Sequence, residues 1–154
     1  MRLVVAVVGK ARHPALGEAI RDYEKRAARY WPLDVHEVRE ERSSGIPVDK
    51  VMQREGDRLS ERIPERAQRI ACEVDGKSFT SIQFADFLRS ARDEDRDTAF
   101  LIGGAYGLAP KVTAASTMRI SLAPWTLPHE IARLVLAEQI YRAGTIVRGE
   151  PYNK

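Results

Sequence analysis

The sequence predicts an α/β fold in which a parallel sheet carries helices on both faces. Apolar runs of strand length alternate with amphipathic segments along the 154 residues, which is typical of strand–helix–strand units. The run from Leu3 to Val8 is apolar throughout, as in strands that are buried on both faces. Two later runs lead directly into loops of glycine, proline and small residues. Because ligands of open α/β sheets bind at the carboxyl ends of strands, these loops predict a ligand site.

The first half of the chain is predicted to hold two strands and two helices. In order, they are a strand from Leu3 to Val8, a helix from Pro14 to Tyr30, a strand from Leu33 to Val38 and a helix from Asp49 to Arg62. The first helix is indicated by apolar residues spaced three and four apart along one side. The polar segment from Glu40 to Lys50 is predicted to be a mobile loop, with two interpretations: a cover over the active site or a plain connector.

The second half is predicted to continue the alternation. In order, it holds a strand from Ala67 to Val74 ended by a turn at Asp75-Gly76, a helix from Ser81 to Arg92, a strand from Thr98 to Ile102, a short helix from Pro110 to Ala115, a strand from Met118 to Leu122 and a long helix from Pro128 to about Ala143. Thr80 and Gln83 have the spacing of a capping box at the start of a helix. That helix is expected to bury Ile82, Phe84, Phe87 and Leu88.

Composition indicates one globular domain, residues 1–154, in the cytoplasm. Hydrophobic residues make up 44% of the chain, and no run approaches the roughly 20 apolar residues of a membrane helix. The opening apolar stretch lacks a small-residue cleavage site and is interpreted as a strand rather than a signal peptide. The single cysteine, Cys72, excludes an internal disulfide and a cysteine-based metal site, so no metal is predicted. A net charge of +3 permits a nucleic-acid partner without requiring one.

The segments Phe100–Leu108 and Ser121–His129 are the most informative part of the sequence. Each takes an apolar strand into a bend of small residues, and glycine allows a backbone to approach a ligand closely. Together they predict a cofactor cleft lined mainly by main-chain atoms. The glycines do not match the dinucleotide or Walker phosphate-binding patterns. The alternative interpretation of Gly103-Gly104 is a tight turn from strand to helix.

The polar residues of the predicted C-terminal helix each have two possible interpretations, one structural and one functional. Apolar side chains surround most of its circumference, which is typical of a helix buried by another subunit. Glu138 and Arg142 are four residues apart in the order that favours an ion pair. That pair is either structural, at a dimer interface, or it directs Arg142 at a substrate. His129 is either a general base near the helix start or a capping and packing residue.

Five motifs are spread along the chain: Leu101-Ile-Gly-Gly-Ala-Tyr-Gly-Leu108, Ser121-Leu-Ala-Pro-Trp-Thr-Leu-Pro-His129, Ala137-Glu-Gln-Ile-Tyr-Arg142, Arg148-Gly-Glu-Pro-Tyr152 and Ile70-Ala-Cys-Glu-Val-Asp-Gly-Lys77. Together they resemble motifs of the small SPOUT methyltransferases that modify 23S ribosomal RNA. The opening strand and the overall length are similar as well, so the resemblance covers essentially the whole chain.

The resemblance implies an α/β fold with a C-terminal trefoil knot, S-adenosylmethionine bound in the knot, and a homodimer. It also implies methylation of N3 of a pseudouridine in 23S ribosomal RNA, within the large subunit of the ribosome. The alternative function is a non-catalytic module of the same fold that binds the ribosome or RNA. A nucleotide hydrolase would need a phosphate cradle and magnesium ligands, and the sequence has neither in recognisable form.

Residue by residue, the resemblance implies a cofactor site and three catalytic residues. Arg142 would stabilise the developing anion, His129 or a water would accept the N3 proton, and Tyr152 would stack on or orient the base. The cofactor would lie against Cys72, Gly103, Gly104, Leu122, Ala123, Pro124, Trp125, Thr126 and Leu127.

Three positions depart from the family pattern. Cys72 stands where leucine is common and Ala105 where proline is common, and both changes are expected to be mild if backbone groups hold the cofactor. Asn153 stands where relatives carry histidine. Asparagine cannot take up a proton at neutral pH. Either the tail residue positions the substrate by hydrogen bonding, which Asn153 could imitate and which we expect, or proton removal takes place elsewhere.

Overall fold

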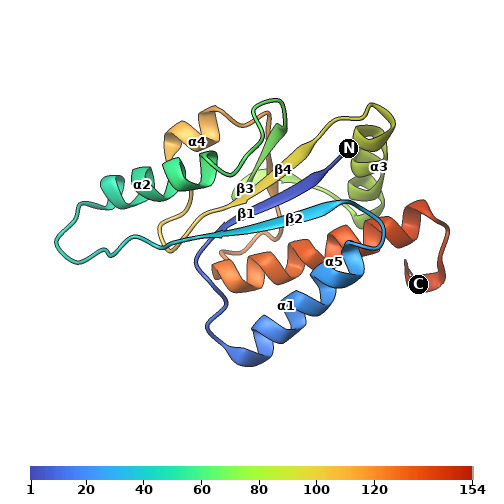
Figure 1. Cartoon of the computed structure of the whole chain (residues 1–154), viewed down its shortest axis with the longest axis horizontal. Coiled ribbons are helices and arrows are strands. Elements are labelled where there is room, and N and C mark those ends of the chain that lie inside the picture. The colour runs from blue at the N-terminus through green and yellow to red at the C-terminus, as the bar shows by residue number, and fades with distance from the viewer. Residues whose placement is uncertain (154) are drawn as a thin grey trace.

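The computed structural model describes residues 1–153 and contains one parallel five-stranded sheet of order β2-β1-β4-β3-β5. The strands are β1 (Leu3–Val8), β2 (Leu33–Val38), β3 (Gln68–Ser78), β4 (Thr98–Ile102) and β5 (Met118–Ser121). The helices are α1 (Pro14–Ala27), α2 (Val48–Ser60), α3 (Ser81–Asp93), α4 (Pro110–Ala114), α5 (His129–Val147) and a final 3₁₀ turn (Pro151–Asn153) (Figure 1). The side chain of Asn153 lies outside the described part, so its predicted role stays a prediction.

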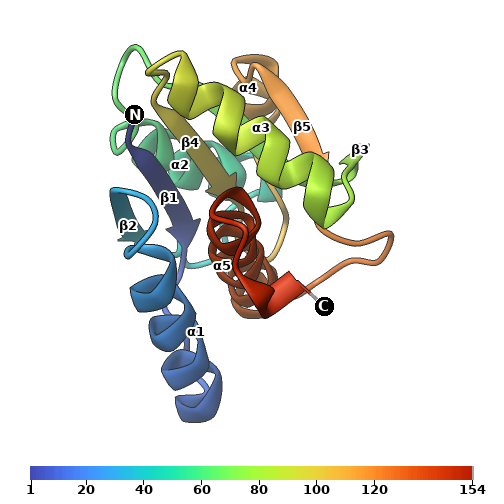
Figure 2. The ribbon, with the colours of Figure 1, turned by 90° about the vertical axis from the view of Figure 1, so that its right-hand side faces the viewer.

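Helices cover both faces of the sheet, and the predicted fold class is confirmed. Helices α1, α3 and α5 lie on one face, and α2 and α4 lie on the other (Figure 2). Alternate residues of β1 serve the two layers, because successive strand side chains point to opposite faces. Leu3, Val5 and Val7 pack in the core that includes Leu136, whereas the even-numbered residues from Val4 to Val8 pack in the core that includes Leu59.

Several elements begin and end at the residues that the sequence predicts. Strands β1, β2 and β4 begin and end at the predicted residues. The capping box at the start of α3 is also present: the Gln83 backbone N–H donates to Thr80 Oγ1 at 3.2 Å, and the Thr80 N–H donates to Gln83 Oε1 at 2.9 Å. These features depend on local sequence, so sequence patterns identify them.

The predicted turn at Asp75-Gly76 is wrong, because β3 continues to Ser78. The register of β3 against β5 shifts instead, so that both Cys72 and Lys77 lie opposite Ile120. Gly76 fits there because a Cβ at this position would overlap the Ile120 backbone. The glycine therefore permits close strand contact rather than a reversal of the chain.

Three other predictions need correction at helices. Helix α1 ends at Ala27, and turn residues 28–30 follow it. Helix α5 continues to Val147, beyond the predicted end at Ala143. Ile82, expected in the core, is 57% exposed, whereas Phe84 and Leu88 on the same helix are buried. Apolar content alone does not show which side of a short helix is buried and which is exposed.

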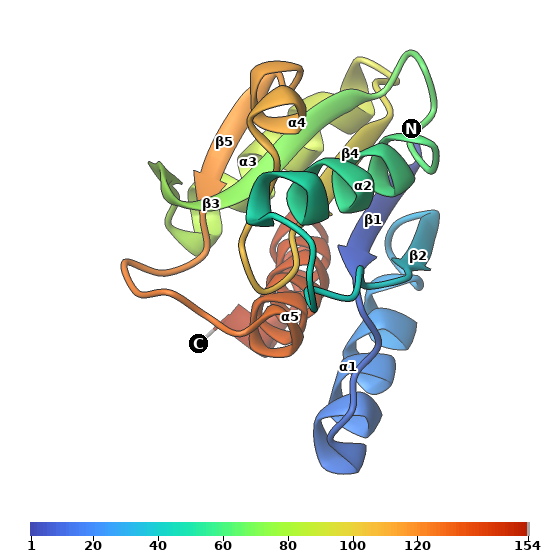
Figure 3. The same cartoon turned by 90° about the vertical axis from the view of Figure 1, so that its left-hand side faces the viewer.

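The chain leaves β4 and β5 at the same edge of the sheet, beside the first turn of α5 (Figure 3). This is the edge at which ligands of parallel α/β sheets bind. Within residues 1–153, no helix is long and apolar enough to cross a membrane.

Candidate cofactor and active site

A cavity of about 640 Å³ lies at this edge of the sheet. Its walls are the loops that follow β4 and β5, the irregular part of β3 and the first turn of α5. Eight of the nine predicted cofactor residues line it, and Pro124 does not. The eight are Cys72, Gly103, Gly104, Leu122, Ala123, Trp125, Thr126 and Leu127.

Close backbone contacts shape the glycine loop that follows β4. The Gly107 N–H donates to the Gly104 carbonyl at 3.0 Å, which closes the loop on itself. A Cβ built on Gly103 would lie 2.5 Å from the carbonyl carbon of Gly107. No side chain fits in that space, so Gly103 contributes only main chain to the cavity wall.

Part of the cavity wall is not predicted by the sequence patterns. Glu73, Val74 and Asp75 also line it, on the irregular part of β3. They escaped notice because the Asp75-Gly76 pair suggested a turn that ended the strand. The available signal was the position of Cys72, since the residues after it continue along the same edge. Two acidic residues therefore belong to the wall of a cavity that is otherwise largely apolar or main chain, and the carboxylates of both lie close to Arg119, at 3.8 Å from Glu73 and 2.9 Å from Asp75.

The Cys72 thiol stays protonated at neutral pH. Desolvation by burial, with a smaller effect of the neighbouring Glu73 carboxylate, raises the pKa of Cys72 to about 12. Because only the thiolate is a good nucleophile, Cys72 is a wall residue of the cavity and not a covalent catalyst.

His129 is the first residue of α5 and lines the cavity. Its Nε2 is buried with no hydrogen-bond partner in the described chain and lies 3.7 Å from Glu40 Oε1. Glu40 is also paired with Arg12. The capping interpretation is not supported, because Pro128 is the N-cap residue and α5 has no side-chain cap bond. The imidazole is thus placed between the cavity and a carboxylate.

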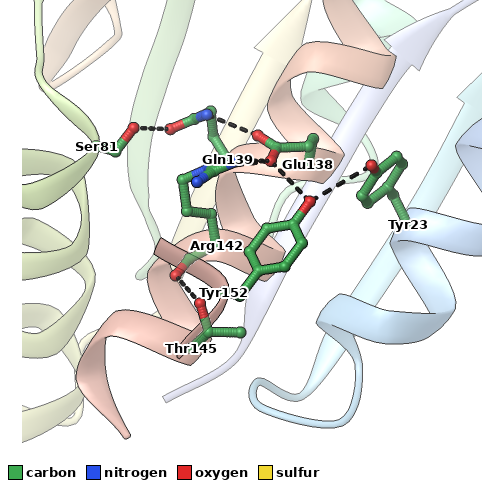
Figure 4. Close-up of polar contacts among 7 residues, drawn as sticks. All are labelled: Tyr23, Ser81, Glu138, Gln139, Arg142, Thr145 and Tyr152. Atoms are coloured by element: carbon green, nitrogen blue, oxygen red, sulfur yellow. Dashed lines mark hydrogen bonds and ion pairs between the residues drawn. The ribbon is translucent and has the colours of Figure 1, made fainter. Parts of the chain in front are cut away.

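Arg142 belongs to a separate cluster on α5 and the C-terminal tail (Figure 4). It donates twice to Glu138 Oε1, from Nη2 at 2.6 Å and from Nε at 3.0 Å. The Tyr152 hydroxyl donates to the same oxygen at 3.2 Å, and the Arg142 guanidinium lies over the Tyr152 ring at 4.7 Å from its centroid. The hydrogen bond to Glu138 raises the pKa of Arg142 further, so the guanidinium is a fixed positive charge.

The predicted catalytic residues therefore fall into two groups within one chain. His129 lies at the cavity together with the cofactor candidates, whereas Arg142 and Tyr152 are absent from the cavity wall. The predicted Glu138–Arg142 ion pair is confirmed, and both of its interpretations remain compatible with the geometry. No group of three or more His, Cys, Asp or Glu residues within the described range could hold a metal ion.

Comparisons with known proteins agree over the whole chain. Residues 1–153 match the family model described as a predicted SPOUT methyltransferase. The chain is 54% identical over 154 residues to the ribosomal RNA large subunit methyltransferase H of Gemmatimonas aurantiaca, and the match covers all of both chains. It is 40% identical over 155 residues to the protein of that name in Anaeromyxobacter dehalogenans, again over all of both chains. A putative member in Methanococcus maripaludis is 34% identical over 159 residues, with the same coverage.

Proposed function

The chain belongs to the SPOUT methyltransferase family, and on this premise we propose that it methylates N3 of a pseudouridine in 23S ribosomal RNA of the large ribosomal subunit. The methyl donor would be S-adenosylmethionine. The relatives carry the name of an enzyme that modifies large-subunit ribosomal RNA. The observation that carries the proposal is the cavity of about 640 Å³ lined by the glycine loop after β4 and by the loop after β5.

The cavity fits S-adenosylmethionine in size and chemistry. Its volume falls within the roughly 300–1,000 Å³ of small-molecule sites. Backbone groups of residues 103–107 and 122–127 can bind the flat adenine and the ribose without long side chains. Glu73 and Asp75 also line the cavity, and both carboxylates are paired with Arg119. When bound, the cofactor supplies a sulfonium-activated methyl group, and the protein's task is to align the nucleophile with it.

The proposed mechanism assigns one task to each polar residue. His129 takes the N3 proton, since its imidazole lies at the cavity wall and histidine is the side chain that most often serves as a general base. Arg142 stabilises the negative charge that develops on the imide, because it is held charged by Glu138. Tyr152, already stacked under that guanidinium, offers an aromatic face to an unpaired base.

Two chains are needed to complete this site. Arg142 and Tyr152 do not line the cavity of their own chain, whereas large apolar side chains around the cavity are exposed, with Val74 at 48%, Tyr106 at 44% and Trp125 at 75%. A homodimer would cover these side chains and bring the Arg142–Tyr152 cluster of one protomer to the cavity of the other. Family membership further implies that the C-terminal segment forms a trefoil knot. The 23S ribosomal RNA would contact both protomers.

The decisive experiment uses tritiated S-adenosylmethionine and ribosomes from a strain that lacks the modification. We expect label in the large-subunit RNA, at N3 of one pseudouridine after nucleoside mapping. Calorimetry with S-adenosylhomocysteine is run alongside. Cofactor binding without transfer of label would favour the alternative, a non-catalytic ribosome-binding module, and label in another nucleoside would overturn the assigned substrate.

A further inference from the structure

Glu55 is a buried carboxyl group that the proposed mechanism does not use. It lies in the middle of α2, on the helix face that packs toward the sheet, and is only 4% exposed. Acidic side chains are rarely buried to this extent without a partner that compensates for lost hydration. The position of Glu55 therefore calls for an explanation.

One carboxyl oxygen has a partner and the other has none. Glu55 Oε1 accepts a hydrogen bond from the Glu41 backbone N–H at 2.9 Å. Oε2 is buried and has no hydrogen-bond partner in the described residues. The charged groups that face Glu55 are Glu40, Glu41 and Arg58, and burial raises the pKa of Glu55 more than the Glu41 N–H and Arg58 lower it. Burial thus makes this carboxyl group easier to protonate than an exposed glutamate.

Glu55 Oε2 lies next to Gly104, which belongs to the cavity wall. A Cβ built on Gly104 would meet Glu55 Oε2 at 2.7 Å and Val8 Cγ1 at 3.0 Å. Gly104 itself lines the cavity. The Gly104 backbone is therefore held between the carboxyl group on one side and the ligand space on the other.

Gly56, the next residue of α2, allows this helix to pack closely against α4. A Cβ on Gly56 would lie 2.7 Å from Val112 Cγ2 and 3.2 Å from Ala109 Cβ, so α2 contacts α4 and the residue before it without a gap. The glycine loop that follows β4 ends at Ala109, directly before α4. Glu55 therefore lies next to this loop near its start, at Gly104, and Gly56 lies next to it at its end, at Ala109.

From this geometry we propose that Glu55 is a positioning residue for the cofactor. Its carboxyl group holds Gly104 in place, and its bond to Glu41 ties the loop after β2 to the same point. Removing the carboxyl lets the glycine loop relax away from the cofactor and weakens binding. This inference rests on the proposed function of the cavity as an S-adenosylmethionine site.

The test compares S-adenosylhomocysteine affinity, measured by calorimetry, across five proteins. They are the wild type, Glu55→Gln, Glu55→Ala, Gly104→Ala and the double variant Gly104→Ala/Glu55→Ala. Because glutamine keeps the size of the side chain and an oxygen that can accept from the Glu41 N–H, Glu55→Gln is expected to bind within about twofold of the wild type. Glu55→Ala and Gly104→Ala are expected to bind roughly tenfold more weakly. The double variant is expected to bind about fivefold more tightly than Gly104→Ala, since contacting residues are energetically coupled and the new Cβ then occupies freed space.

Two further measurements separate positioning from simple stability. Thermal unfolding is recorded for each variant, and steady-state methylation gives KM for the cofactor and kcat separately. A positioning role raises KM and leaves kcat nearly unchanged. Glu61→Ala, at the exposed C-terminal end of the same helix, is the control and should behave as the wild type.

The outcomes distinguish this inference from the proposed function. If the wild type does not bind S-adenosylhomocysteine, the proposed function fails. If the wild type binds but folded Glu55→Ala binds equally well, or the double variant gains nothing over Gly104→Ala, the inference is overturned. Should Glu55→Ala not fold, Glu55→Asp replaces it: the shorter acid must bind more weakly than Glu55→Gln, and equal affinities overturn the inference.

Discussion

The two polar regions of this molecule are built in opposite ways. The cavity is formed by main chain at places where space or strand contact excludes side chains, as at Gly103. The α5 cluster is formed by side chains alone, with Arg142 and Tyr152 both bound to Glu138 Oε1. We expect the cavity to be sensitive to added atoms and the cluster to be sensitive to removed charges. Cofactor affinity and reaction rate are therefore expected to respond to different substitutions.

The largest effect is expected from adding one carbon to the cavity wall. In Gly103→Ala the new Cβ would lie 2.5 Å from the Gly107 carbonyl carbon, and backbone cannot yield as a side chain can. Overpacking costs typically about 1–3 kcal/mol, so affinity for S-adenosylhomocysteine should fall by about ten- to a hundredfold in calorimetry. Gly17→Ala is the matched control, because a Cβ there meets Arg21 Nη1 at 3.2 Å and no backbone. Unchanged affinity of Gly103→Ala would contradict a main-chain site.

The next largest effect is expected on the rate alone. Arg142→Ala removes the fixed charge of the cluster, and loss of one group that stabilises a developing anion costs about 10²–10³ in kcat. Cofactor affinity should stay within about twofold, as measured by calorimetry beside the methylation assay. Arg89→Ala, which breaks an exposed pair with Asp86, serves as control. A wild-type rate in Arg142→Ala would exclude the proposed charge role and leave the structural interpretation of the Glu138–Arg142 pair.

A smaller effect on kcat is expected when the hydroxyl of Tyr152 is removed and its ring is kept. Tyr152→Phe loses the hydrogen bond to Glu138 but keeps the ring under Arg142. A typical hydrogen bond contributes about 1 kcal/mol, so kcat should fall about fivefold, whereas Tyr152→Leu should lose considerably more. If Phe and Leu reduced the rate equally, stacking on the base would not be the function of Tyr152.

The smallest effect is expected at Cys72. Its thiol is neutral at pH 7 because its pKa is raised to about 12, and Cys72 is proposed only to line the cavity. Cys72→Ala should change S-adenosylhomocysteine affinity less than about threefold, the loss of a few van der Waals contacts. Iodoacetamide at pH 8 should leave the folded wild type unmodified and alkylate the unfolded chain. Rapid alkylation of the folded protein would show a thiolate and contradict the assignment.

Sequence patterns predict the cavity far better than the cluster. Alternating strands and helices identify the sheet edge, and glycine-rich loops identify the wall at Gly103 and Gly104, because both depend on local residues. The contribution of Glu73 and Asp75 was hidden, since Gly76 serves a strand contact rather than a turn. Glu55 was hidden as well, because its contact with Gly104 joins residues far apart in the chain. The separation of Arg142 from the cavity likewise depends on tertiary packing.

The most direct test of the account is a crystal structure with S-adenosylhomocysteine. We expect the ligand in the cavity, with its adenosine against the backbone of residues 122–127 and of Gly104, and with Arg142 of a second protomer at the open side. A ligand bound elsewhere, or bound in this cavity with no second protomer near it, would show that the proposed shared site is wrong.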